Sequence, residues 1–289
     1  MQERLSAIRS ADRAAGAIQS EVPAPAAAFL EEQLFLVLAV RDQGGAVWVT
    51  LLTGPAGFAR APHSDIVEVA ALPVLGDPAR RALRGPALVG LLAIEPSTRR
   101  RMRFNGLARP AALPGGSGLR IELHQVYANC PKYIQQREPS LRRRGKPGAA
   151  IVGKALSEEQ QHWLRHADTL FIGTADPSGN ADASHRGGTP GFVEVVSPGR
   201  IRFPDYAGNS MYMTLGNIEV HPAAGLLLID WSAGATLQLS GAAHVDYDRQ
   251  ATPGVPGALR IVDFSVLATV QLPNRLSLAW TPPIPSRFN

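Results

Sequence analysis

The sequence has few features of a secreted or membrane protein. It has one cysteine, Cys130, among 289 residues, which excludes an internal disulfide framework and makes a reducing cytoplasm the simplest compartment. Charges such as Arg4 and Arg9 interrupt the first 25 residues, so the apolar core of a signal peptide is missing. The apolar stretch 86–94 ends at Glu95 and is too short to span a bilayer. We therefore expect a soluble, cytoplasmic protein that does not enter a membrane.

Signatures of metal, hydrolytic and nucleic-acid chemistry are also sparse. His162 and His166 lie one helical turn apart, but no cysteine or paired acidic motif accompanies them, so no metal site is expected. Ser184 and His185 are neighbours in an expected strand and point to opposite faces, which argues against a nucleophile and its base. Aromatic residues make up 6% of the chain and do not interleave with the arginines, so a nucleic-acid partner is disfavoured. The sequence assigns no catalytic residue.

What the chain does have is an ordinary core composition and an excess of positive charge. Hydrophobic residues make up 45% and charged residues 18%, and the length suggests two domains. The net charge of +5 favours an anionic partner such as a phosphate. Much of the excess positive charge lies in two clusters, 99–103 and 142–146. The alternative interpretation of each cluster is a solvated face or a basic linker.

The second half of the chain repeats the first. Gly-Leu-Leu-Ala-Ile-Glu at Gly90–Glu95 aligns with Gly-Leu-Leu-Leu-Ile-Asp at Gly225–Asp230, and the segments that follow align without a gap. Upstream the copies differ, because Val49–Thr53 is mostly apolar where Ser184–Gly188 reads Ser-His-Arg-Gly-Gly. The pattern indicates one fold used twice, with function in the second copy.

Most of the expected structure is β-sheet. From Phe35 onward, short apolar segments are separated by turn signals, and Thr236–Ser240 alternates as a half-buried antiparallel strand does. The expected helices cover residues 5–18, 77–83, 129–139 and 210–218, and one that follows a capping box at Ser157 and runs through His166. At the start of the third of these, Cys130 is either a thiolate activated near Lys132 or a buried structural residue.

These elements predict a mainly β protein with short helices. We expect an N-terminal helical extension over residues 1–28, a first lobe over 29–140, a basic linker over 141–150 and a second lobe over 151–289.

Two polar segments of the second copy are candidates for a ligand site. Asp182–Gly188 combines hydroxyl, imidazole and guanidinium donors with two glycines, which let a flat ligand approach the backbone. Phe203–Ser210 ends before an expected helix whose N-terminus, with Thr214, suits a phosphate. The alternative is a glycine-rich turn followed by an ordinary helix cap.

On these segments the chain resembles the flavin-nucleotide-binding proteins related to pyridoxamine 5′-phosphate oxidase, which have the FMN-binding split-barrel fold. The resemblance runs from about Phe29 to Arg275 and rests on five motifs in order. They are RRRMRFNG (99–106), NCPKYIQ (129–135), SHRGGTPGFV (184–193), FPDYAGNSMYMTLGNI (203–218) and GLLLIDW (225–231). The resemblance implies tandem six-stranded antiparallel barrels with FMN at their junction.

The resemblance also implies which residues form the site. Those expected to bind FMN are Ser184, His185, Arg186, Gly187, Gly188, Pro204, Asp205, Tyr206, Asn209, Ser210 and Thr214 of the second lobe, with Arg101, Arg103 and Asn105 reaching across from the first. Trp231 and Lys132 are assigned to the substrate pocket, and most aromatic residues of such barrels are otherwise core. Because the matching strand 234–238 carries no charge, we expect one FMN per chain and leave association into a homodimer open.

In one respect the sequence departs from the oxidase pattern. The oxidase has an Arg-Lys pair at the start of the helix after its second site strand, whereas Asn209–Thr214 has no cation. The vitamin B6 substrate is therefore not carried over. The resulting hypothesis is an FMN-dependent oxidoreductase that moves two electrons to or from a small molecule, with its electron donor undefined. The alternative is a flavin- or haem-binding carrier without turnover.

Overall fold

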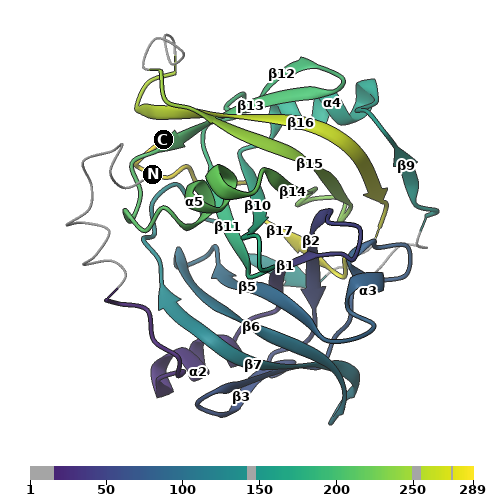
Figure 1. The fold of residues 1–289 in the computed structure, drawn as a ribbon, viewed down its shortest axis with the longest axis vertical. Helices are drawn as coiled ribbons and strands as arrows, with labels where there is room; N and C mark the ends of the chain where they lie inside the picture. The colour runs from purple at the N-terminus through teal and green to yellow at the C-terminus, as the bar shows by residue number, and fades with distance from the viewer. Residues whose placement is uncertain (1–15, 142–147, 249–254, 275) are drawn as a thin grey trace.

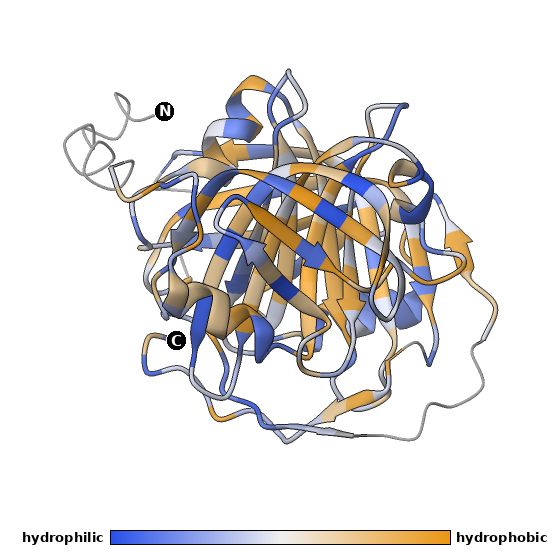
Figure 2. Cartoon of the chain, turned by 90° about the horizontal axis from the view of Figure 1, so that it is seen from below, coloured by the Kyte–Doolittle hydropathy of each residue, from blue (hydrophilic) through white to orange (hydrophobic). Residues whose placement is uncertain are grey.

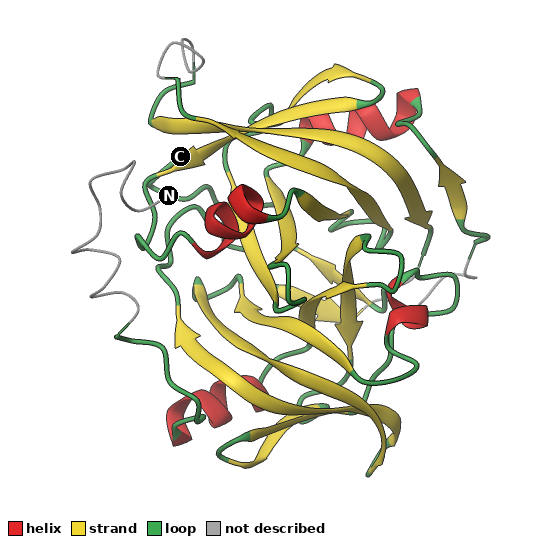
Figure 3. Ribbon diagram, in the orientation of Figure 1, coloured by secondary structure: helices red, strands yellow, loops and turns green. Residues whose placement is uncertain are grey.

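Two antiparallel sheets with the same strand order contain most of the regular secondary structure that the described residues form (Figures 1 and 3). The computed structural model describes residues 16–141, 148–248, 255–274 and 276–289. The first sheet has the order β2-β1-β5-β6-β7-β4-β3 and the second the order β11-β10-β14-β15-β16-β13-β12, with β9 added beside β16. The repeat seen in the sequence is thus a repeat of topology, and the sheets have seven and eight strands rather than the six implied for each barrel.

The elements of the first lobe are α2 (Ala24–Glu31), β1 (Phe35–Arg41), β2 (Val47–Thr53), β3 (Ala59–His63), β4 (Ile66–Val69), α3 (Ala79–Ala82), β5 (Ala87–Glu95), β6 (Arg100–Leu113) and β7 (Gly116–Ala128). Those of the second are β9 (Ile151–Gly153), α4 (Glu158–His166), β10 (Thr169–Ala175), β11 (Ala181–Gly187), β12 (Glu194–Ser197), β13 (Arg200–Tyr206), α5 (Met213–Val220), β14 (Ala223–Ile229), β15 (Thr236–Asp246) and β16 (Ala258–Leu272). A small separate sheet joins β8 (Pro139–Leu141) to β17 (Leu278–Trp280).

Apolar residues cover the inner faces of both sheets (Figure 2). The strands β1, β5, β10 and β14 are buried on both faces and are mainly apolar throughout. Each lobe has its own core. A third apolar cluster lies between the lobes and includes Phe35 and Leu51 of the first with Phe171 and Leu227 of the second. The two lobes therefore share buried surface as well as a chain.

The repeated Gly-Leu-Leu motif explains how closely the lobes approach. A Cβ on Gly90 of β5 would lie 2.5 Å from the Asp182 Cα of β11. At the matching position of the other lobe, a Cβ on Gly225 of β14 would lie 2.5 Å from the Val47 carbonyl oxygen of β2. Only glycine permits such backbone contact, so the two lobes meet through equivalent strands.

Several local predictions can be compared with the structure. The capping box at Ser157 is present and α4 follows it, as expected. The helix expected over 129–139 is wrong: Tyr133 has a left-handed φ of 64°, and Gln136 forms a β-bridge with Ile284 instead of continuing a helical hydrogen-bond pattern. The sequence reading missed α2, whose first turn includes a proline. Most of the N-terminal helix expected over 5–18 lies outside the described residues.

Candidate functional site

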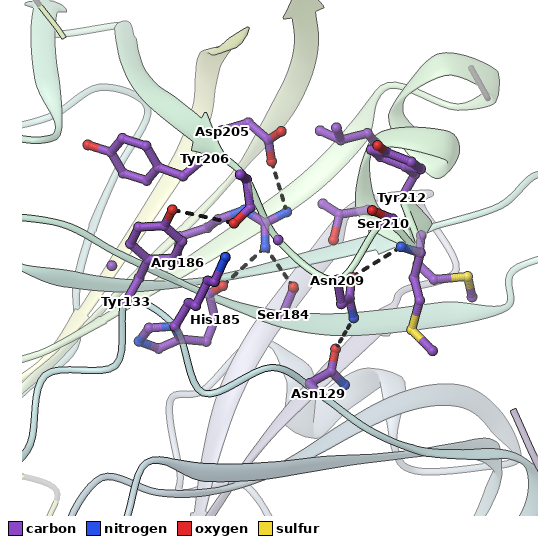
Figure 4. Close-up of a pocket in the computed structure, with 18 of the residues that line it drawn as sticks. Asn129, Tyr133, Ser184, His185, Arg186, Asp205, Tyr206, Asn209, Ser210 and Tyr212 are labelled. Atoms are coloured by element: carbon purple, nitrogen blue, oxygen red, sulfur yellow. Dashed lines mark hydrogen bonds and ion pairs between the residues drawn. The ribbon is translucent and has the colours of Figure 1, made fainter. Parts of the chain in front are cut away.

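A polar cavity of about 180 Å³ lies where β11, β13 and the start of α5 meet β6 of the first lobe (Figure 4). Most of the residues expected to bind a cofactor line it: Ser184, His185, Arg186, Gly187, Asp205, Tyr206, Asn209, Ser210, Thr214, Arg101 and Arg103. Lys132, assigned to the substrate pocket, also lines it. We call this cavity the basic pocket.

Arg103 of β6 forms the main polar connection between the lobes beneath the basic pocket. Its Nη1 lies 2.8 and 2.9 Å from the two carboxylate oxygens of Asp182 and 3.0 Å from the Tyr127 hydroxyl. Its Nη2 donates to Ser184 Oγ at 2.5 Å. Burial opposes the charge of Arg103, but Asp182 and Tyr127 outweigh it and raise the pKa of the guanidinium. This arginine is therefore fixed in place before any ligand binds.

Arg101, two residues earlier on the same face of β6, has no such carboxylate partner. Its Nη1 lies 3.1 Å from His185 Nδ1, and its buried Nε has no hydrogen-bond partner. Burial, followed by repulsion from Arg103 and Arg186, lowers the pKa of Arg101 to about 9. Because a guanidinium only donates, His185 Nδ1 must accept this bond.

The second lobe adds two more arginines on the opposite side. Arg186 Nη1 donates to Ser184 Oγ at 2.7 Å and its Nη2 lies 3.9 Å from Asp205 (Figure 4). Arg260 of β16 lies 3.2 Å from the other oxygen of Asp205. Burial raises the pKa of the Asp205 carboxyl, against the opposing pull of these two arginines. One carboxylate is thus shared between two cations.

The charge of the basic pocket is unbalanced. Five cationic side chains line it, Arg101, Arg103, Arg186, Arg260 and Lys132. Among the described lining residues Asp205 is the one carboxylate, and Asp182, behind the wall, pairs with Arg103. The buried Nε atoms of Arg101 and Arg186 and the Nη1 of Arg260 have no hydrogen-bond partner, whereas Arg260 Nε is the atom that pairs with Asp205. Unpaired buried donors are costly, so the donor set matches an anion with several acceptor oxygens.

Two tyrosines stack at the pocket. The rings of Tyr133 and Tyr206 lie 4.9 Å apart at an angle of 19°, and the Tyr133 hydroxyl donates to the Ala207 carbonyl at 3.4 Å (Figure 4). Tyr133, Ser210 and Tyr212 have φ values of 64°, 61° and 54°. Non-glycine residues adopt this conformation at a cost and cluster at binding sites.

The segment that leads into α5 completes the wall. Asn209 Nδ2 donates to Asn129 Oδ1 at 2.6 Å, while Asn209 Oδ1 accepts from the Met211 amide at 3.2 Å. The helix begins at Met213, three residues later than expected, and its N-cap, Tyr212, makes no side-chain capping bond. The N-terminus of α5 therefore faces the basic pocket without a capping side chain.

Four expected residues lie outside the lining of the basic pocket: Gly188, Pro204, Asn105 and Trp231. Trp231 instead packs at right angles on Trp280, with ring centroids 4.9 Å apart, in a groove on the second lobe. Close packing within the protein requires glycine at positions 187 and 188. A Cβ on Gly187 would lie 2.1 Å from the Tyr133 carbonyl oxygen, and one on Gly188 would lie 2.7 Å from Phe192.

Several lining residues were not among those predicted from the sequence, and they include Arg260, Tyr133 and Asn129. Arg260 pairs in register with Asp205 across β13 and β16, so only the strand pairing reveals it. Tyr133 and Asn129 belong to the segment that was expected to be helical. The available signal for Arg260 was its charge: it is an arginine in an otherwise mainly apolar strand, and Asp205 in an earlier strand could pair with it.

The equivalent position in the first lobe is closed. Val49 and Leu51 stand where Ser184 and Arg186 stand in the second lobe, and they pack with Leu278 and Trp280 in the apolar cluster between the lobes. Gln238, which aligns with Arg103, donates to the Val49 carbonyl at 3.0 Å and to Asp77 at 2.8 Å. The described residues thus form this basic site once.

Other candidates from the sequence contribute no site. His162 and His166 lie with ring centroids 4.1 Å apart and ring planes tilted by 35° on an exposed face of α4. Within the described residues no cluster of three metal-ligating side chains occurs. Nor is any described helix long and apolar enough to cross a membrane.

Comparison with known proteins agrees with this architecture. Residues 156–271 match the family described as pyridoxamine 5′-phosphate oxidase. The identical strand orders of the two sheets confirm the expected fold class of two tandem lobes, mainly β with short helices. A comparison with curated protein sequences gave no match.

Three solved structures with similar folds each cover less than half of the chain. A putative pyridoxamine 5′-phosphate oxidase from Lactobacillus delbrueckii is 19% identical over 40% of this chain and 94% of its own, with a TM-score of 0.33. HupZ from Group A Streptococcus is 11% identical over 38% of this chain and 90% of its own, with a TM-score of 0.32. A protein from Clostridium acetobutylicum related to general stress protein 26 is 12% identical over 43% and 91%, with a TM-score of 0.31.

Proposed function

The C-terminal half of the chain belongs to the pyridoxamine 5′-phosphate oxidase-like split-barrel family, and from this premise we propose that the basic pocket binds FMN. We further propose that the chain is an oxidoreductase for a small molecule. The lobes meet at the pocket, so one chain supplies both sides of the site and binds one cofactor.

The observation that carries the proposal is the set of unpaired arginine donors. Arg101, Arg186 and Arg260 each bring buried N–H groups without partners to a cavity whose one lining carboxylate is Asp205. FMN carries a phosphate dianion and a ring edge with carbonyl acceptors. It can therefore neutralise the positive charge of the basic pocket and accept hydrogen bonds from its arginines. The first-lobe position, which lacks these arginines, is filled with apolar side chains.

When bound, FMN supplies two-electron redox chemistry. The protein groups would hold it and favour its reduced form: arginines that are already oriented stabilise negative charge more than mobile ones do. Arg103 is the best oriented, because Asp182 and Ser184 fix its guanidinium. The uncapped start of α5 adds a positive dipole end for the phosphate.

The cavity of about 180 Å³ is smaller than the 300–1,000 Å³ usual for cofactor-sized ligands. The stacked rings of Tyr133 and Tyr206 form the section of the wall that can move to admit a flat ring, because both side chains are incompletely buried. We therefore expect the two rings to separate or slide when FMN binds.

Haem ligation through His185 is disfavoured by the same geometry. Arg101 donates to His185 Nδ1, so the neutral imidazole carries its proton on Nε2, the nitrogen that would bind iron. Burial, then repulsion from Arg101 and Arg186, lowers the pKa of His185 well below its usual value. His185 is therefore a neutral positioning residue.

The direct test is a comparison of FMN with riboflavin. The purified protein should show flavin bands after FMN addition, and titration calorimetry should give tighter binding for FMN than for riboflavin. Arg186→Met and Arg260→Met should each weaken FMN binding by about 1.5–3 kcal/mol, roughly 10- to 100-fold, the scale of a charge-assisted hydrogen bond.

A matched control is Arg200→Met, which removes an arginine that lies 46% exposed and pairs with Asp263 on the outer side of the same sheet. It should leave FMN affinity unchanged. Equal affinity for FMN in the wild type and both pocket variants would remove the basic pocket as the site. Screening small-molecule substrates and reductants against the flavin-loaded protein then tests whether the chain turns over.

A further inference from the structure

A second cavity, of about 190 Å³, lies in the same crevice between the lobes. β6 and β11 border both cavities: Arg103 and Ser184 line the basic pocket, while Asn105 and Asp182, two residues along the same strand faces, line the second. Met213 at the start of α5 lines both. The Arg103–Asp182 ion pair therefore lies at the boundary of two neighbouring cavities.

The chemistry of the second cavity is the opposite of the first. Four side-chain amides line it, Asn105, Gln125, Asn180 and Asn217, together with the carboxylates of Asp176 and Asp182 and the imidazole of His124. No arginine or lysine is among its described lining residues. We call it the amide pocket.

One amide leaves an acceptor unpaired. Asn105 is 6% exposed, and its Nδ2 donates to Gln125 Oε1 at 3.3 Å and to Asp182 Oδ1 at 3.4 Å. Its Oδ1 is buried and has no partner. Turning the amide over would set that oxygen against the Asp182 carboxylate, which only accepts. The Arg103–Asp182 pair thus fixes the Asn105 carbonyl as an acceptor.

A buried acceptor without a donor is unfavourable, and a ligand that donates an N–H or O–H to it removes the penalty. An anion is disfavoured by the Asp176 carboxylate, because the described lining offers no arginine or lysine and Asp182 is already paired with Arg103. We propose that the amide pocket is the substrate site, and that it takes a small uncharged or cationic molecule with N–H or O–H donors, such as an amine, amide or polyol. The substrate role rests on the proposed FMN site beside it, whereas the binding chemistry does not.

The test uses ethanolamine, acetamide and acetate as probes of the full chain, with and without FMN. Side-chain amide signals of Asn105 and Gln125, assigned by nitrogen-15 NMR from the Asn105→Leu and Gln125→Leu variants, report binding. Ethanolamine and acetamide should shift these signals saturably, and acetate should not. Asn105→Leu should weaken the binding of both donor probes at least tenfold, and Asn217→Ala, a second lining variant, should weaken it as well.

Gln161→Leu, an amide on α4 outside both pockets, is the matched control and should bind the probes as the wild type does. The absence of any saturable shift, or equal binding of acetate, overturns the proposal. If the protein binds the probes but does not bind FMN, the amide pocket is a ligand site but not the substrate site of a flavoenzyme. The proposals for the amide pocket and for FMN binding can therefore fail separately.

Discussion

Arg103 and Asp182, 79 positions apart in the sequence, form a buried ion pair across the junction of the two lobes at 2.8 and 2.9 Å. Tyr127 donates to the same carboxylate at 3.0 Å, and Asn105 approaches it at 3.4 Å. The aligned positions in the other half of the junction are Gln238 and Val47, which make no such pair. This one relationship makes the two halves of the interface chemically different.

Removing the carboxylate should therefore destabilise the protein strongly. Asp182→Ala leaves the Arg103 guanidinium buried without its counter-charge, and breaking one side of a buried pair typically costs about 3–5 kcal/mol. Urea unfolding of the variant should show that loss in the free energy of unfolding. The matched control is Asp263→Ala, which breaks the partly exposed pairs with Arg200 and Arg202 and should cost about 1 kcal/mol or less. A similar loss in both variants would contradict the role assigned to Arg103 and Asp182.

The internal repeat made much of this architecture predictable. Positions such as Gly90 and Gly225 align because the same backbone contact is made twice, and the contrast between Val49 and Ser184 located the polar side of the interface. Arg260 was not predictable, because its place opposite Asp205 depends on the register between β13 and β16. Tyr133 was missed because a segment that resembles a helix start takes its hydrogen bonds from the distant C-terminal residues.

Asp77, which accepts a hydrogen bond from Gln238 at the closed position of the first lobe, should make the free energy of unfolding depend on pH. Burial raises the pKa of Asp77 to about 6, against the hydrogen bonds from Thr50, Ala79 and Gln238. Because the folded value lies above the unfolded one, the contribution of Asp77 to stability is full below about pH 4 and is lost as the pH rises through about 6. The difference amounts to about 3 kcal/mol.

Measuring the free energy of unfolding of the wild type and of Asp77→Asn from about pH 4 to pH 8 isolates this term. The variant should lack it, so its stability relative to the wild type should rise over that interval. Parallel curves for the two proteins would show that Asp77 keeps an ordinary pKa.

His185 should remain neutral through the physiological range. Burial, then repulsion from Arg101 and Arg186, holds its pKa well below the usual value, so its ring carbon signals should not titrate between about pH 8 and pH 5. Its Nε2, rather than Nδ1, should carry the proton, as judged by nitrogen-15 NMR. Arg101→Met removes both the donor and the nearest positive charge, so the pKa of His185 should rise. Titration of His185 near pH 6.5 in the wild type would contradict the contact with Arg101.

The final prediction concerns the second lobe alone. A fragment of residues 151–289 would expose Phe171, Leu227 and the other second-lobe members of the shared apolar cluster, so it should associate into a dimer. Each partner would then present Thr236 and Gln238 of β15 where the full chain presents Arg101 and Arg103. FMN affinity should therefore fall even though the dimer buries its interface, and adding a fragment of residues 1–150 should restore it. Replacing Thr236→Arg and Gln238→Arg in the fragment should recover part of the affinity, because the partner would again supply the two arginines. If the isolated lobe stays monomeric and binds FMN as tightly as the whole chain, the first lobe does not contribute to the site.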